Sequence, residues 1–238
     1  MPRTDAADPA VPPTSATPRV LTVNVGRPRP SPDTRAPGGL TGIDKRPVQG
    51  PVEVSAPGPA GVGGSGLAGD AVCDLDHHGG DDQAVYAYAR EDLDHWEAAL
   101  GRELSNGLFG ENLTTAGIDV NAVLIGERWR LGPALLLEAT SPRIPCRTFA
   151  GRLGVDGWVK RFTAGARPGV YFRVLRPGPV RAGDRVEVVH RPDHEVTSAF
   201  LFRALTTAPE LRPRVIAAGE ALHAEALTKA RAWAAATG

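Results

Sequence analysis

Cysteine is nearly absent from this sequence, because the 238 residues contain only Cys73 and Cys146. Two cysteines far apart along the chain cannot form the disulfide framework of a small secreted protein. In a reducing compartment each of them would be a free thiol, although a single disulfide between them is left open. The sequence therefore raises the question of what each thiol does.

Net charge and long apolar runs are absent too. Lys and Arg number 27, as do Asp and Glu, so no overall field draws the protein toward nucleic acid or an anionic membrane. No apolar run approaches the ~20 residues of a membrane span, and the polar, proline-rich start has no stretch typical of a signal peptide. We expect a soluble, cytoplasmic protein whose anion recognition, if any, is local.

Several cofactor motifs are also missing. No G-x-G-x-x-G follows a strand pattern, and the sequence has neither an iron–sulfur cysteine pattern nor a haem motif. The alternating strand and helix rhythm of a dinucleotide-binding fold does not occur. If the protein catalyses a redox reaction, its electrons must therefore come from a separate reductase.

What the sequence does contain is a succession of short strand patterns between turns. These patterns lie at residues 20–26, 51–55, 66–74, 122–132, 134–140, 169–180 and 184–192. Half-buried strands at short spacing suit a closed or nearly closed barrel, which removes exposed strand edges. The predicted fold class is mainly β (α+β), with a disordered, proline-rich segment at residues 1–18 and one main domain at residues 19–192.

One helix is predicted between these strands. From residue 82 to residue 100 the apolar side chains recur on one face at helical spacing. Asp81 or Asp82 is available as the N-terminal cap, and Gly101 stands just past the end. The spacing therefore predicts a helix over residues 82–100.

A tail of three short helices is predicted at residues 193–238. Its apolar residues fall at helical intervals that are broken near Pro209 and Gly219. The basic residues of the tail are scattered along the sequence, which argues against a DNA-binding helix-turn-helix. We expect this tail to be an appendix that packs on the main domain or forms the contact of a homodimer.

Two adjacent cations stand in the loop TGIDKRPVQG, residues 41–50. Lys45 and Arg46 and the backbone N–H groups of such a turn could hold an anion. The signal is weak by itself, and a solvated basic loop explains it equally well.

A pair of histidines precedes the predicted helix in the stretch DHHGGDDQAVYAY, residues 76–88. His77 and His78 are adjacent and point to opposite sides of an extended chain, so they do not readily bind one metal together. We expect one of them to face the core or a pocket. The two glycines that follow allow a sharp turn toward a helix N-terminus that could hold an anion, whereas a simple capped turn is the alternative.

A glycine-rich loop, GLFGENLTTAG, spans residues 107–117. Its three glycines let the main chain approach a ligand closely, and short polar side chains accompany them. Phe109 can pack beneath such a loop. The alternative is an ordinary turn stabilised by Asn112.

The most informative stretch is SPRIPC, residues 141–146. Two prolines fix the backbone on either side of Arg143, so that Cys146 is presented from a stiff arm after a strand. Arg143 and Arg147 would lower the pKa of its thiol and favour the thiolate, the form that acts as nucleophile or metal ligand. An inert buried thiol is the usual alternative, and we assign it to Cys73.

Together these motifs resemble one family. SPRIPC, FGENLTT, HHGGDDQAVYAY and TGIDKRPV, in register across residues 19–238, are similar to the MOSC domain family, which is named for the molybdenum cofactor sulfurase C-terminal domain. The resemblance is to its YiiM-like branch, whose members carry a three-helix tail.

This resemblance implies a MOSC-type β-barrel with a small C-terminal helical subdomain and a pocket for the molybdenum cofactor (molybdopterin). Cys146 would be the catalytic residue and a sulfur ligand of the metal, which suits a soft thiolate. The cofactor-binding residues that the resemblance implies are Lys45, Arg46, His78, Asp82, Phe109, Gly110, Glu111, Asn112, Leu113 and Arg143. Members of this branch are associated with reduction of N-hydroxylated small molecules such as hydroxylaminopurines and amidoximes, and the family also with pyridoxal phosphate binding.

Two other functions remain open at this point. The first is a non-catalytic carrier or sensor that binds the cofactor or another anion in the same pocket. The second is a cofactor-independent thiol enzyme with Cys146 as nucleophile, for which no His or Asp stands at a recognisable spacing to act as base.

Overall fold

The computed structural model describes residues 17–236. Its strands are β1 (Arg19–Gly26), β2 (Arg29–Pro30), β3 (Leu40–Thr41), β4 (Lys45–Pro47), β5 (Val52–Val54), β6 (Val85–Ala89), β7 (Leu113–Ala116), β8 (Arg128–Leu131), β9 (Leu135–Ser141), β10 (Val170–Arg176), β11 (Gly178–Val180) and β12 (Val186–His190). Its helices are η1 (Pro37–Gly39), η2 (Asp81–Gln83), α1 (Arg90–Leu100), α2 (Arg147–Leu153), α3 (Trp158–Gly165), α4 (Ser198–Thr206), η3 (Pro209–Ala221) and α5 (Ala224–Ala235). Residues 1–16 of the segment predicted to be disordered lie outside the described residues.

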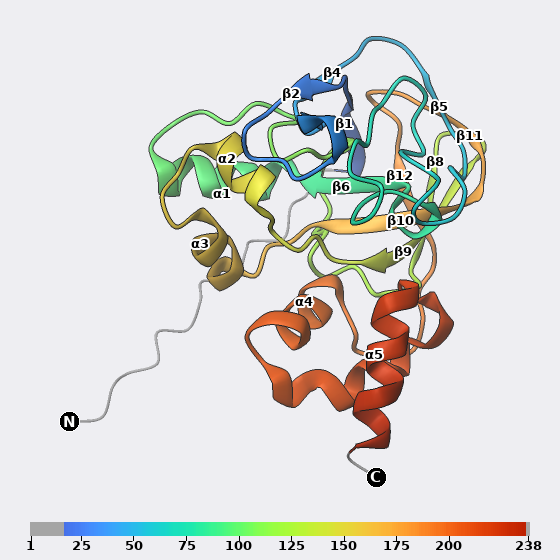
Figure 1. The fold of residues 1–238 in the computed structure, drawn as a ribbon. Helices are drawn as coiled ribbons and strands as arrows, with labels where there is room; N and C mark the ends of the chain where they lie inside the picture. Colours follow the sequence, from blue (N-terminus) through green and yellow to red (C-terminus); the bar gives the residue numbers. More distant parts are fainter. Residues whose placement is uncertain (1–16, 237–238) are drawn as a thin grey trace.

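Eight strands form one mixed sheet in the order β12-β8-β9-β10-β6-β7-β1-β4, with β6 and β7 as its parallel pair. Figure 1 shows the strands in the upper part of the molecule and α4 and α5 beneath them. The sheet curls until β1 meets the start of β12. There Arg19 forms a bridge with Arg185, and the N–H of Val20 donates to the carbonyl of Asp184 at 2.8 Å. Because this contact is an isolated bridge and not a full ladder, the sheet is curled but is not a closed barrel; the mixed sheet and its helices confirm the α+β class.

The helix predicted over residues 82–100 is wrong in its first half. The range begins with the single turn of η2, residues 85–89 form β6, and the α-helix α1 covers only residues 90–100, ending at Gly101 in the left-handed conformation as expected. The side chains of β6 alternate between two cores: Val85 joins the core enclosed by the sheet, whereas Tyr86 joins the aromatic core under the helices. All five residues are buried, and this two-sided burial overrides a spacing that also fits a helix.

Residues 66–74, predicted as a strand, form a loop instead. Leu67 makes a single bridge with Val54, and the chain then crosses β1, where the N–H of Ala71 donates to the carbonyl of Gly26 at 2.9 Å. A turn at residues 68–69, in which Gly69 has a φ of +78°, interrupts this stretch, so it has no continuous partner strand among the described residues. The loop carries Cys73 to the same side of the molecule as the predicted functional motifs.

The aromatic core packs α1, α2 and α3 against the sheet. Phe109 lies at its centre, with ring centroids 5.0 Å from Phe149, 5.6 Å from Trp158 and 6.2 Å from Phe162. These rings are fully buried or nearly so. Burial of this much aromatic surface fixes α2, and with it the chain that leads into α2.

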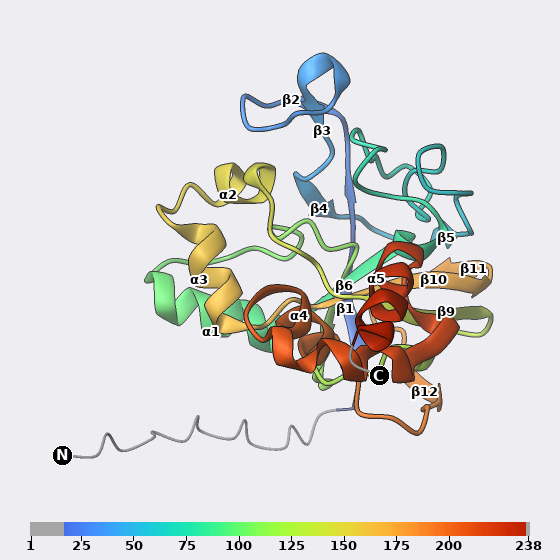
Figure 2. The ribbon, with the colours of Figure 1, turned by 60° about the horizontal axis from the view of Figure 1, so that its bottom comes forward.

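The tail forms three helical segments, as the sequence predicts. α4, η3 and α5 pack on one another around a core of their own (Figure 2), in which Leu201 and Val215 are fully buried. Thr197 caps α4 by accepting from the N–H of Phe200 at 3.0 Å. Pro209 begins η3, and Gly219 interrupts its helical conformation, at the positions where the apolar pattern breaks.

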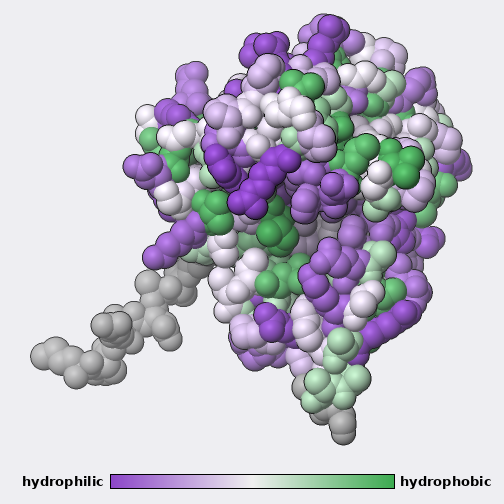
Figure 3. Space-filling view, in the orientation of Figure 1, coloured by the Kyte–Doolittle hydropathy of each residue, from purple (hydrophilic) through white to green (hydrophobic). Residues whose placement is uncertain are grey.

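The surface shown in Figure 3 is mostly hydrophilic, with hydrophobic residues in small separate patches. Such scattered exposure is normal for a globular protein. Among the helices of residues 17–236, none is both long and apolar enough to span a bilayer.

Candidate functional site

A cavity of about 100 Å³ lies where four segments converge: the chain before β4, the loop that crosses β1, the glycine-rich loop and the SPRIPC arm. Its lining residues are Thr34, Leu40, Thr41, Gly42, Ile43, Lys45, Ala71, Val72, Cys73, Asp74, His78, Gly110, Arg143, Cys146, Thr148 and Tyr171. The space is smaller than the ~300–1,000 Å³ of sites that enclose a drug-sized ligand. It can hold one end of a cofactor, whose remainder would lie at the opening.

Cys146 enters this cavity at the N-terminal cap position of α2. Burial by itself would raise the pKa of its thiol, but a hydrogen bond from His78, the charge of Arg143 and the N–H of Phe149 together lower that pKa from 9.0 to about 6. The group is therefore mainly a thiolate at neutral pH. His78 thus does what the sequence analysis expected of Arg147, whose exposed side chain turns toward Asp33.

Arg143 is a buried cation that has no carboxylate partner among residues 17–236, and its anionic neighbour is the Cys146 thiolate. Its side chain is 7% exposed, and Cζ lies 4.5 Å from the ring centre of Phe149 and 5.2 Å from that of Tyr86. Within the described part of the chain it forms no salt bridge, and its Nε has no hydrogen-bond partner. Because a buried guanidinium requires hydrogen-bond acceptors, this side chain is prepared for an anionic ligand.

Lys45, in contrast, is already neutralised. Both oxygens of Asp70 lie 2.5 Å from its Nζ, and Asp70 also accepts from the N–H of Gly26 and from the amide of Asn112. Burial lowers the pKa of Lys45 despite this ion pair. The ammonium group therefore lines the cavity as half of a buried pair, with little charge left for a second anion.

The glycine-rich loop is held by an internal carboxylate. Glu111 is fully buried and accepts from the N–H of Gly107 at 2.5 Å, the N–H of Phe109 at 3.1 Å and the hydroxyl of Thr114 at 2.9 Å. Only Gly110 of this loop lines the cavity; its φ is +77°, and a Cβ there would lie 3.4 Å from Nη1 of Arg143. The loop shapes the cavity through its backbone.

The structure separates the predicted site residues into two groups. Those that line the cavity are Lys45, His78, Gly110, Arg143 and Cys146. Those that do not are Arg46, Asp82, Phe109, Glu111, Asn112 and Leu113. In the second group Phe109 and Leu113 belong to the hydrophobic cores, and the polar Glu111 and Asn112 support the loop from behind.

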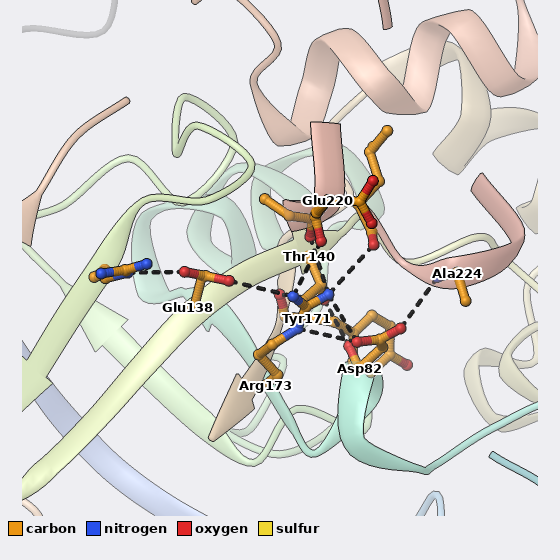
Figure 4. Close-up of polar contacts among 10 residues, drawn as sticks. Asp82, Glu138, Thr140, Tyr171, Arg173, Glu220 and Ala224 are labelled. Atoms are coloured by element: carbon orange, nitrogen blue, oxygen red, sulfur yellow. Dashed lines mark hydrogen bonds and ion pairs between the residues drawn. The ribbon is translucent and has the colours of Figure 1, made fainter. Parts of the chain in front are cut away.

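Arg46 and Asp82 lie elsewhere for identifiable reasons. Arg46 alternates with Lys45 along β4, so its exposed side chain pairs with Asp44 outside the cavity at 3.1 Å. Asp82 joins Arg173 at 2.8 Å and accepts from the N–H of Ala224 at 3.1 Å, which ties the sheet to the helical tail (Figure 4).

Two of the cavity residues that sequence reasoning missed bear on its chemistry. Cys73, expected to be an inert strand residue, lines it from the crossing loop, and burial raises the pKa of its thiol. Tyr171 lines it from β10 and stacks on Tyr86 with ring centroids 4.7 Å apart; burial raises the pKa of its hydroxyl. The alternation of β10 offered the only signal for Tyr171, and the sequence held none for Cys73.

The donor set decides what kind of metal would fit. Among residues 17–236, no three His, Cys, Asp or Glu side chains are grouped to hold a metal ion. A bare ion would therefore lack ligands, whereas a metal that arrives with ligands of its own needs only the thiolate. The buried, unpaired Arg143 fits the anionic character of a phosphate- and sulfur-bearing cofactor. The residues present thus suit the group that the sequence motifs imply.

Comparison with known proteins agrees with these motifs. Residues 74–187 match the family model of the MOSC domain. Protein YflK of Bacillus subtilis (strain 168) is 36% identical over 187 residues, which cover 77% of this chain and 79% of that protein. A protein named reductase from Gibberella moniliformis is 33% identical over 138 residues, 57% of this chain and 24% of that protein. The crystal structure of YiiM from Geobacillus stearothermophilus is 26% identical, with a TM-score of 0.70, and the match covers 91% of this chain and 98% of that one.

Proposed function

Because the chain belongs to the MOSC domain family, we propose that it binds a molybdenum cofactor through Cys146 and reduces N-hydroxylated small molecules. The family's association with the molybdenum cofactor supports the cofactor, and the relative named a reductase supports the class of reaction. This chain covers only 24% of that relative, so the activity of the whole relative does not carry over.

The observation that carries the proposal is the thiolate in the cavity. Cys146 has a pKa of about 6 and lines a cavity with His78 and the unpaired Arg143. A soft, ionised sulfur suits a molybdenum centre as a protein ligand. Aromatic packing of α2 holds this sulfur in a fixed position, as a metal ligand requires.

Four of the residues that line the cavity have a task in the proposed reaction. Cys146 would bind the metal through Sγ, and Arg143 would pair with an anionic group of the cofactor. The cofactor, when bound, supplies two-electron redox chemistry at its metal. His78 keeps Sγ ionised through its hydrogen bond. Tyr171 keeps its hydroxyl proton at neutral pH, because burial raises its pKa, and would donate a hydrogen bond to the substrate oxygen.

The overall reaction consumes electrons that the chain cannot store. An N-hydroxylated substrate takes up two electrons and two protons, its N–O bond breaks, and the amine and water leave. Because the sequence has no flavin, haem or iron–sulfur motif, the electrons would come from a separate reductase. This partner is part of the proposal, as is the N-hydroxylated substrate.

The test uses protein made in a host that synthesises the cofactor. Elemental analysis should find molybdenum in the wild type and little in Cys146→Ala, and the loaded wild type should convert benzamidoxime to benzamidine with reduced methyl viologen as donor. His77→Ala is the matched control, because this exposed neighbour of His78 pairs with Asp74 outside the hydrogen bond to Cys146. Equal molybdenum in the wild type and Cys146→Ala would contradict the proposed ligand.

The same experiment separates the alternatives. Molybdenum that is bound through Cys146 without turnover of any N-hydroxylated compound would favour a carrier or sensor. Turnover by metal-free protein would instead favour a thiol enzyme.

A further inference from the structure

A second cavity lies on the other side of the SPRIPC arm. It encloses about 250 Å³ between the arm, η2 and the helical tail, beneath the ends of α4 and α5. Its lining residues are Gln83, Ser141, Pro142, Ile144, Leu205, Thr206, His223, Glu225, Ala226 and Lys229. None of them lines the cavity of Cys146.

Two buried polar atoms of residues that line this second cavity have no hydrogen-bond partner among the residues that the structure describes. Ser141 is 7% exposed, yet its Oγ makes no hydrogen bond, and the Oε1 of Gln83 is buried and equally unpaired. The adjacent Thr140 shows the contrast, because its hydroxyl donates to the carbonyl of Asp82 at 2.6 Å. Buried oxygen atoms without donors are costly, so these two indicate a missing hydrogen-bonding group.

The walls of the second cavity are largely apolar. Pro142, Leu205 and Ala226 line it, together with Ile144, whose side chain is 45% exposed although large and hydrophobic. Charged side chains stay at its edge as a pair, since Lys229 Nζ lies 2.6 Å from Glu225. An uncharged ring would therefore bury apolar surface without displacing a charge.

We propose that this cavity is a second small-molecule site, which binds a neutral, flat molecule that carries an N–H donor. The ring of such a ligand would lie against Ile144 and Leu205, and its N–H group would donate to Oε1 of Gln83 and Oγ of Ser141 once rotation of these two side chains turns the atoms, which are closed to solvent in the free protein, toward the cavity. The site does not depend on the cofactor or on the reaction proposed for Cys146.

The test compares two probes that share a ring. Benzamide offers an NH₂ donor, whereas acetophenone keeps the ring and the carbonyl but has no donor. In ¹H–¹⁵N spectra of the labelled full chain, benzamide should shift the amides of residues 141, 143, 144, 205 and 206, and its Kd should be about tenfold lower than that of acetophenone, as expected for one buried hydrogen bond.

Three variants make the test specific. Leu205→Trp should abolish benzamide binding by filling the cavity, whereas Val188→Trp, a comparable change on the exposed face of β12, should leave it intact. Ser141→Ala should weaken benzamide several-fold and acetophenone little, a readout that stands even if Leu205→Trp fails to fold. Cys146→Ala should bind benzamide like the wild type, which separates this site from the first cavity.

Three outcomes would overturn the proposal. They are the absence of benzamide binding at these amides, equal affinity for the two probes, and wild-type affinity in a folded Leu205→Trp variant.

Discussion

The ionised state of Cys146 can be tested directly on cofactor-free protein. With a pKa of about 6 in place of 9.0, the fraction of thiolate at pH 7 rises from about 1% to about 90%. A less basic thiolate is also a poorer nucleophile. The logarithm of its rate constant falls with a Brønsted slope of ~0.4–0.5 per pKa unit, so a pKa lower by three units reduces its reactivity about 20-fold. The net gain in alkylation rate at pH 7 is only about fourfold, so the pH midpoint is the better measure.

The assay is the rate of iodoacetamide alkylation of each cysteine between pH 4.5 and 10, followed by peptide mass spectrometry. The rate at Cys146 should rise through a midpoint near pH 6, while Cys73, whose pKa burial raises, should react only at alkaline pH. His78→Ala should move the Cys146 midpoint upward by about one unit, because it removes a hydrogen bond to the charged form. His77→Ala should not move it.

The sign of the accompanying stability change follows from the same pKa. Because folding lowers the pKa of Cys146, the stabilisation from this group is present above the pKa of the unfolded chain and is lost as the pH falls through about 6. A Cys146 midpoint at pH 8.5 or higher, or equal shifts in the two histidine variants, would refute the reasoning about this thiol.

Three further predictions concern other parts of the molecule. Arg173→Ala removes the ion pairs of Arg173 with two carboxylates and its hydrogen bonds to the carbonyls of the tail, so urea titration should show a loss of about 3 kcal/mol in the free energy of unfolding. The control Arg130→Ala breaks an exposed ion pair and should lower that free energy by less than ~1 kcal/mol. Equal losses in the two variants would contradict the role given to Arg173. Gly110→Ala places a Cβ at a φ of +77° and 3.0 Å from Cγ1 of Ile43, so it should cost about 1–2 kcal/mol and lower the molybdenum content; a variant as stable as the wild type would show that the loop adapts. Tyr171→Phe should lower the turnover of benzamidoxime at least ~10-fold at unchanged molybdenum content, and unchanged turnover would remove this residue from the reaction.

The sequence predicted features that depend on local chemistry. The prolines and the arginine around Cys146 indicated a rigid, cationic setting, and the structure has that arm and Arg143 beside the thiol. Breaks in the apolar pattern of the tail predicted its division into three helical segments because Pro209 and Gly219 act locally.

Features that depend on packing between distant segments were not predictable in this way. The apolar residues of Val85–Ala89 fit the period of a helix as well as that of a strand, and only the presence of a core on each side makes this segment a strand. Cys73 reaches the cavity through a loop that crosses β1, a path that no local pattern encodes. The ion pair between Lys45 and Asp70, which stands 25 positions away in the sequence, was likewise not predictable from a local pattern.

The SPRIPC arm serves as a partition between two chambers. Arg143 and Cys146 face one of them, and Pro142 and Ile144 face the other. Because prolines stiffen the arm at residues 142 and 145, we expect a displacement of Ile144 to move the sulfur two positions later. A substitution at this partly exposed isoleucine would therefore alter the thiolate's surroundings, although its side chain never enters the chamber where that sulfur lies.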